Sequence, residues 1–115
     1  MIMDSLAYMQ LINDRQLLDE DAQAILMKHV PNWAVEKAEA VLQLVRRYEF
    51  PNFMAAMAFA NQVAVMAEEN NHHPALLIEW GKATVTWWTH SLGGLHKNDF
   101  IMAARTDRCY SGQIA

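Results

Sequence analysis

The segment from residue 52 to residue 70 constrains the fold most, because it carries the longest sustained helical repeat in the chain. Asn52 is a favourable N-cap, and Asn70 and Asn71 can leave a helix through left-handed conformations. Apolar side chains recur between them at intervals of three and four residues, at Phe53, Ala56, Met57, Ala60, Val63, Ala64 and Ala67. This spacing predicts one long helix with a broad apolar stripe.

Two short segments after this helix alternate in the manner of β-strands. Apolar and polar side chains exchange places through residues 75–80 and 82–89. Gly81 lies between them and is the residue there that can adopt a positive φ at little cost. The sequence therefore predicts an antiparallel hairpin that turns at Gly81.

Shorter patterns assign the segments before the long helix. A first helix begins at Asp19 and ends before Pro31, and residues 33–36 suit a short strand. Residues 40–50 fit a helix almost as well as a strand, and their periodicity alone favours the helix. Because the strand pairs are hairpin-like and no helix crosses between parallel strands, the predicted class is α+β.

The two ends of the chain complete the predicted organisation. Residues 1–18 are weakly patterned, and we expect a short helix or an ordered arm of low stability there. We assign them as an N-terminal extension to a single domain over residues 19–115, because 115 residues suffice for one domain and not for two. Asn98 or Asp99 caps a last helix.

The composition excludes several classes of protein. Hydrophobic residues make up 53% of the chain and charged residues 19%, so the chain is not disordered. A net charge of −4 without a basic cluster argues against nucleic-acid binding, and the apolar stretches are too short for a membrane helix. The single cysteine, Cys109, cannot form an intrachain disulfide. We expect a soluble, cytoplasmic protein.

The candidate chemistry lies around the predicted hairpin, where three of the five histidines occur within 19 residues. His72 and His73 precede the first strand and His90 ends the second, so an antiparallel hairpin can bring them together. Imidazole exchanges protons near neutral pH, and Glu68 could orient one ring and stabilise its protonated form. This set suits a reaction that needs one acid and one base, such as the addition or elimination of water.

Other interpretations of these residues stay open. The histidines could cap strand and helix ends, or His72, His73 and His90 could form a zinc site. The zinc site is the weaker interpretation, because adjacent residues of an extended chain point to opposite sides. The tryptophans could wall a pocket for a flat heterocycle or belong to the core. His96 and Cys109 carry no functional signal of their own.

The spacing of these residues resembles that of the pterin-4a-carbinolamine dehydratase family. Glu68 is followed after three residues by His72-His73-Pro74, then after five by Trp80, after nine by His90 and after eight by Asp99. Pro31-Asn32-Trp33 and Phe50-Pro51-Asn52-Phe53 are also similar to the family, and the likeness covers residues 19–107. It implies a four-stranded antiparallel sheet with helices packed on one face, in the order α-β-β-α-β-β-α, so residues 40–50 become a strand.

The resemblance also implies an activity. The family dehydrates 4a-hydroxytetrahydropterin to quinonoid dihydropterin without a metal or other cofactor, recycles the pterin of aromatic amino acid hydroxylases, and assembles as homodimers and commonly homotetramers. We expect His73 and His90 to transfer protons and Glu68 to orient a histidine. His72, Trp80 and Thr89 would contact the pterin, whereas Asp99 would cap the last helix.

A second function remains possible for the same fold. Similar folds serve as non-catalytic dimerisation or assembly modules that bind a partner protein. Such a module has no physical need for all three histidines, and so their presence favours the enzyme.

Overall fold

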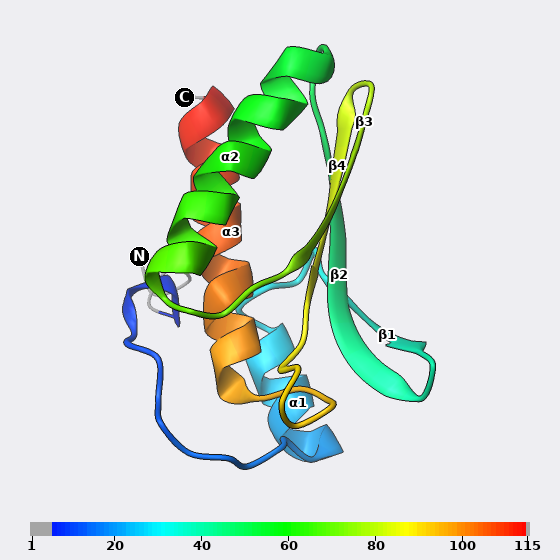
Figure 1. The fold of residues 1–115 in the computed structure, drawn as a ribbon. Helices are drawn as coiled ribbons and strands as arrows, with labels where there is room; N and C mark the ends of the chain where they lie inside the picture. The colour runs from blue at the N-terminus through cyan, green and yellow to red at the C-terminus, as the bar shows by residue number, and fades with distance from the viewer. Residues whose placement is uncertain (1–5, 115) are drawn as a thin grey trace.

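Three helices and a four-stranded antiparallel sheet make up the fold of residues 6–114, the part of the chain that the computed structural model describes (Figure 1). The elements in chain order are α1 (Glu20–Met27), β1 (Ala34–Ala38), β2 (Val41–Glu49), α2 (Phe53–Glu69), β3 (Ala75–Glu79), β4 (Lys82–Trp87) and α3 (Lys97–Ile114). The strand order is β1-β2-β4-β3, so β1 and β3 are the edges. Helices α2 and α3 lie side by side against one face of the sheet (Figure 1). The predicted α+β architecture is confirmed.

Residues 41–49 form strand β2, so the periodicity that favoured a helix was misleading and the family resemblance was right. The two buried side chains of this strand are Leu44 and Tyr48. A separation of four residues fits one face of a helix and one face of a strand equally well. Pairing decides between them: β2 bonds to β1 on one side and β4 on the other, with Val45 opposite both Ala34 and Thr86.

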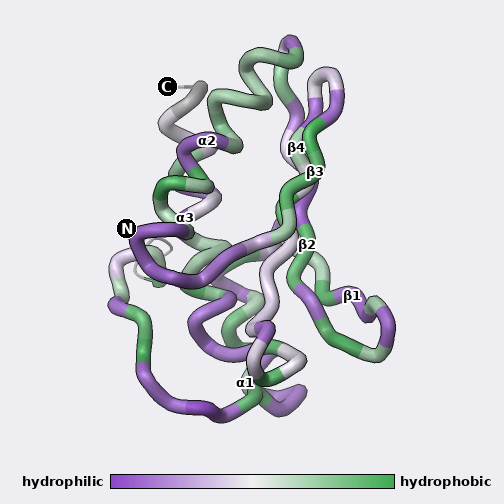
Figure 2. The backbone as a smooth tube through the Cα atoms, in the orientation of Figure 1, coloured by the Kyte–Doolittle hydropathy of each residue, from purple (hydrophilic) through white to green (hydrophobic). Residues whose placement is uncertain are grey.

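Helix α2 confirms the predicted long helix and changes which face is buried. The Asn52 side chain caps it by accepting a hydrogen bond from the amide of Ala55 at 2.8 Å. The fully buried Phe59 was not part of the predicted stripe, whereas Phe53 and Ala64 of that stripe are exposed. Figure 2 shows mostly hydrophobic residues along this helix, which explains why hydropathy alone did not fix its orientation.

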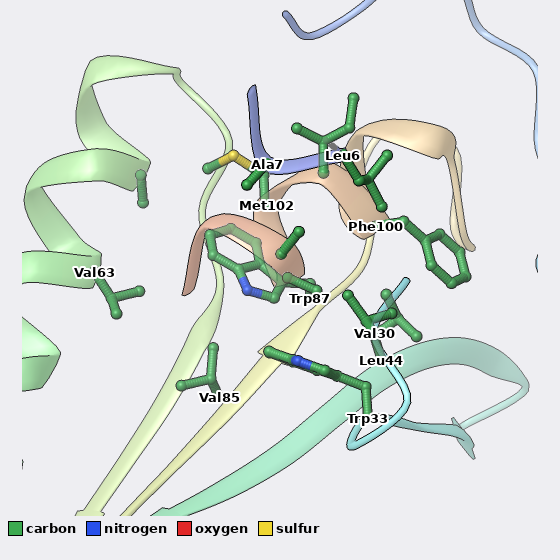
Figure 3. Packing of buried hydrophobic residues seen from close by; sticks show 14 of the residues in the cluster. Leu6, Ala7, Val30, Trp33, Leu44, Val63, Val85, Trp87, Phe100 and Met102 are labelled. Carbon is green, nitrogen blue, oxygen red and sulfur yellow. The ribbon is translucent and has the colours of Figure 1, made fainter. Parts of the chain in front are cut away.

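The core lies between the sheet and the two long helices. Its largest fully buried side chains are Trp87, Tyr48, Phe59 and Phe100. Figure 3 shows Trp87 at the centre, with Val63 of α2 and Met102 of α3 on the helical side. No helix within residues 6–114 is long and apolar enough to cross a membrane.

The N-terminal arm, defined here as residues 6–18, is packed onto the domain. Leu6 and Ala7 are buried members of the core, beside Met102 of α3 (Figure 3). At its other end the amide of Leu18 donates to the carbonyl of Leu95 at 2.9 Å. Residues 6–18 therefore contribute to the core despite their weak pattern, and residues 1–5 of the predicted extension lie outside the described residues.

Candidate active site

A pocket of about 370 Å³ lies at the end of the β3–β4 hairpin that is opposite its turn. One wall comes from the connection between α2 and β3, and the other from the residues that follow β4. The pairing of Ala75 with Thr86 sets the strand register that brings these two connections together. The lining residues are Asn71, His72, His73, Trp88, Thr89, His90 and Ser91. The three histidines singled out in the sequence thus line one pocket.

His72 is held by a buried carboxylate. Its Nε2 lies 2.7 Å from Oδ1 of Asp99, whose side chain is completely buried. Oδ2 of Asp99 accepts two further hydrogen bonds, from the hydroxyl of Thr89 at 2.8 Å and from the amide of His96 at 2.9 Å. Because an ionised carboxylate only accepts hydrogen bonds, Nε2 of His72 carries a proton, and Nδ1 is the nitrogen left for a ligand.

His73 is paired with a carboxylate of a different character. Its Nε2 lies 2.8 Å from Oε1 of Glu68, on the last turn of α2. The His73 side chain is 50% exposed and that of Glu68 is 82% exposed, so water screens this pair strongly. The sequence placed Glu68 beside an unspecified histidine, and the structure identifies that histidine as His73.

His90 is positioned by an aromatic ring. Its imidazole stacks on the indole of Trp88, with 4.2 Å between the ring centroids and 8° between the planes. Sequence analysis gave Trp88 only as one of the tryptophans that could wall a pocket, and Trp88 does line this one. The sequence pattern indicates why: Trp87 points into the core, so the next residue, Trp88, points to the other side of the chain.

Trp80 does not reach this pocket within one chain. It occupies the turn between β3 and β4, at the far end of the hairpin, and is 70% exposed. Gly81 follows it with φ of +71°, which confirms the predicted turn. Thr89, in contrast, lines the pocket and joins it to Asp99.

Asp99 and His96 are the residues whose importance the sequence understated. Helix α3 begins at Lys97, so Asp99 lies in its first turn and caps the helix by accepting from the His96 amide. The sequence predicted Asn98 or Asp99 as the residue before the helix, but both lie inside it, and the contacts of Asp99 with His72 and Thr89 were not predicted. His96 is 2% exposed and bonds to Asp14 of the N-terminal arm at 2.7 Å, contrary to its assignment as a residue without a signal.

Two of the three histidines have one ring nitrogen bonded and one left over. His72 and His73 each use one ring nitrogen on a carboxylate, which fixes the ring and leaves the other nitrogen for a ligand. Among residues 6–114 no group of three or more His, Cys, Asp or Glu side chains is arranged to hold a metal ion.

Comparison with known proteins identifies the family. The model of the family described as pterin 4 alpha carbinolamine dehydratase matches residues 15–109. A curated protein of Marinobacter nauticus is 58% identical over 95 residues, which are 83% of this chain and 85% of that protein. One of Saccharophagus degradans is 50% identical over 92 residues, 80% of this chain and 81% of that protein. Both are named "Putative pterin-4-alpha-carbinolamine dehydratase".

Solved structures share the fold. A Brucella melitensis protein described as a transcriptional coactivator/pterin dehydratase has a TM-score of 0.73 and 26% identity, covering 82% of this chain and 98% of its own. A pterin dehydratase-like protein identified as a RuBisCO assembly factor of the alpha-carboxysome has a TM-score of 0.57 and 22% identity, covering 68% of this chain and 88% of its own. The second likeness concerns the fold alone. On the family match and the curated relatives, this chain belongs to the pterin-4-alpha-carbinolamine dehydratase family.

Proposed function

We propose that the protein dehydrates a 4a-hydroxytetrahydropterin to the quinonoid dihydropterin, with the three-histidine pocket as its active site. The observation that carries the proposal is that His72, His73 and His90 line one pocket. Two of these rings are oriented by carboxylates, and the third is stacked on an indole. A volume of about 370 Å³ is within the range of small-molecule pockets, roughly 300–1,000 Å³.

The reaction requires one acid and one base. The acid protonates the hydroxyl on C4a, the C4a–O bond breaks, and water leaves. The base removes the proton from N5, and its electron pair forms the C4a=N5 double bond. Atoms and charge balance without an oxidant or reductant, so two imidazoles that act as a donor and an acceptor of protons are sufficient.

We assign the proton transfers to His73 and His90. His73 is half exposed and can exchange protons with water, and Glu68 holds its ring in one orientation. His90 lies across the pocket with its ring face fixed on Trp88. His72, buried against Asp99, is suited to hold the pterin in place.

The test is the dehydration rate of 4a-hydroxytetrahydropterin, generated in situ by a hydroxylase, with wild type, His73→Ala and His29→Ala. His29 follows helix α1 and does not line the pocket, so its variant controls for the loss of a histidine. We expect wild type to accelerate the reaction, His73→Ala to lower the rate by about 100-fold or more, and His29→Ala to match wild type.

The other outcomes are equally informative. Acceleration that is unchanged in His73→Ala would retain the enzyme and reject the assignment of His73. Folded wild type that neither binds a pterin nor accelerates the reaction would reject the enzyme. A non-catalytic module that binds a partner protein would then be the better interpretation.

We also infer that the chain forms a dimer through strand β3. The edge strand β1 carries the charges of Glu36 and Lys37, which discourage edge pairing. The other edge strand, β3, has the sequence Ala-Leu-Leu-Ile-Glu, so its first four residues are uncharged. Leu77 at its centre is 57% exposed. A two-fold axis at Leu77 would place Trp80 of one copy opposite Pro74 of the other, next to His73.

This dimer gives Trp80 the pocket role that one chain cannot provide. We expect a dimer in sedimentation equilibrium and a monomer after Leu77→Lys, since a charge on a paired edge is unfavourable. Trp80→Ala should raise KM while the protein stays dimeric. A monomeric wild type, or unchanged kinetics in Trp80→Ala, would contradict the inference.

A further inference from the structure

The N-terminal arm contacts the loop that supports the candidate active site. The family match begins at residue 15, so residues 6–14 of the arm precede it. Asn98 bonds to Ile12 in both directions: its Oδ1 accepts from the Ile12 amide at 2.8 Å and its Nδ2 donates to the Ile12 carbonyl at 2.9 Å. Arg105 donates to the carbonyls of Ala7 and Met9 at 3.2 and 2.8 Å. Specific hydrogen bonds therefore fix the arm on α3.

A further contact joins Asp14 of the arm, whose side chain is 50% exposed, to His96, whose side chain is 3% exposed. Nε2 of His96 lies 2.7 Å from Oδ1 of Asp14 and 3.1 Å from its carbonyl oxygen. Nδ1 of the same ring accepts a hydrogen bond from the amide of Asn98 at 3.0 Å. Since Nδ1 accepts, Nε2 must carry the proton and donate to Asp14. Both ring nitrogens of His96 are thus committed, and the imidazole is fixed between the arm and the start of α3.

The backbone of His96 connects this contact to the pocket. Its amide donates to Oδ2 of Asp99, the carboxylate that holds Nε2 of His72. A second contact runs in parallel, because the Leu17 side chain lies against Gly94, whose carbonyl accepts from the amide of Thr89. Asp14 and Leu17 therefore contact residues 94–96, the segment that bonds to Thr89 through Gly94 and to Asp99 through His96.

We propose that Asp14 and His96 are positioning residues that fix the orientation of His72 in the pocket through Asp99. The effect of these two residues on catalysis rests on the proposed function. Their effect on the orientation of the His72 ring does not. Asp14 and His96 would then fix the orientation of the His72 ring, although neither residue lines the pocket.

The experiment compares Asp14→Ala, Asp14→Asn and Leu11→Ala. Asparagine keeps a side-chain oxygen that can accept from His96, and alanine removes it. Leu11 packs on the core from the arm and takes no part in the hydrogen bonds of the His96 ring, so Leu11→Ala removes arm packing and spares those bonds. The readouts are kcat/KM, the thermal midpoint, and the ¹⁵N chemical shifts of the His72 ring, which report its tautomer and do not depend on activity.

We expect Asp14→Ala to lower kcat/KM by about tenfold or more and to shift the His72 ring signals. Asp14→Asn should restore both, and Leu11→Ala should lower the thermal midpoint while leaving both unchanged. His72 signals that are identical in wild type and Asp14→Ala would overturn the proposal. Equal losses of kcat/KM in Asp14→Ala and Leu11→Ala would also overturn it, because the arm would then act only on stability. If wild type is inactive, the ring signals still decide the coupling, and only the proposed function fails.

Discussion

The substitution Asp99→Asn tests the centre of the candidate site. The two oxygens of the Asp99 carboxylate accept three hydrogen bonds, from His72, Thr89 and His96. The asparagine amide has only one oxygen. This oxygen is best placed at the position of Oδ2, where it accepts from both Thr89 and His96. The amide NH₂ would then face Nε2 of His72, where a proton already lies. To avoid two opposed donors, the ring must move its proton to Nδ1, the nitrogen left for the ligand.

The size of the effect follows from the burial of the group. A hydrogen bond to a charged group contributes about 1.5–3 kcal/mol to stability, and the Asp99 side chain is completely buried, so solvent does not screen the loss. For a domain of this size that corresponds to a fall of about 6–12 °C in Tm. If the same free energy is lost from the transition state, kcat/KM falls by about 10-fold to 150-fold.

Asp107→Asn is the matched control. Asp107 lies on the same helix and also accepts three hydrogen bonds, from the Trp33 indole, the Arg46 guanidinium and the Tyr48 hydroxyl. It does not line the pocket. All three donors bond to Oδ1 of Asp107, an oxygen that asparagine keeps, and the side chain is 28% exposed. Asp107→Asn should therefore lower Tm by less than Asp99→Asn and leave the dehydration kinetics at the wild-type level.

The assay is steady-state dehydration at a temperature where wild type and both variants are folded by circular dichroism. ¹⁵N shifts of the His72 ring then give its tautomer in wild type and in Asp99→Asn. Wild-type kcat and KM in Asp99→Asn would refute the reasoning, as would a His72 ring that keeps its proton on Nε2.

Three further predictions concern the turn, the arm and the thiol. Gly81→Ala should lower the free energy of unfolding by about 1–2 kcal/mol in urea titration, because φ is +71° and an added Cβ would lie 3.1 Å from the Phe50 carbonyl oxygen. The hydrogen bond from the Gln16 amide lowers the pKa of Asp14 below its usual 3.8, so its stabilisation is present above that pH and lost below it. Asp14→Asn should therefore lose less stability than wild type between pH 6 and pH 3. Burial raises the pKa of the Cys109 thiol, so it should alkylate more slowly at pH 8 than free cysteine.

Local signals in the sequence were sufficient for the elements that local chemistry defines. The Asn52 cap and the turn at Gly81 lie where the residue types require them, because a cap oxygen and a positive φ are properties of single residues. Strand β2 was ambiguous for the same reason: the spacing of Leu44 and Tyr48 is common to both periodicities, and only pairing with distant strands decides. Elements fixed by non-local pairing need tertiary information.

The support of the pocket was harder to predict than its lining. His72, His73 and His90 are brought together by one hairpin, and so their convergence follows from strand register. The contact between Asp14 and His96 spans 82 residues and joins an unpatterned arm to a loop. No periodicity encodes such a contact.

The carboxylate partners of His72 and His73 differ in their exposure to water. Asp99 is completely buried and the His72 side chain is 13% exposed, so their hydrogen bond is formed in a medium of low dielectric constant and holds one tautomer firmly. Glu68 and His73 are largely exposed, so water weakens their attraction and can deliver or remove the proton of His73. A ring that must position a ligand benefits from the first environment, and a ring that must be reprotonated in every turnover benefits from the second. This difference in burial supports our proposal that His72 positions the pterin and His73 transfers protons, although the two histidines are adjacent in the sequence.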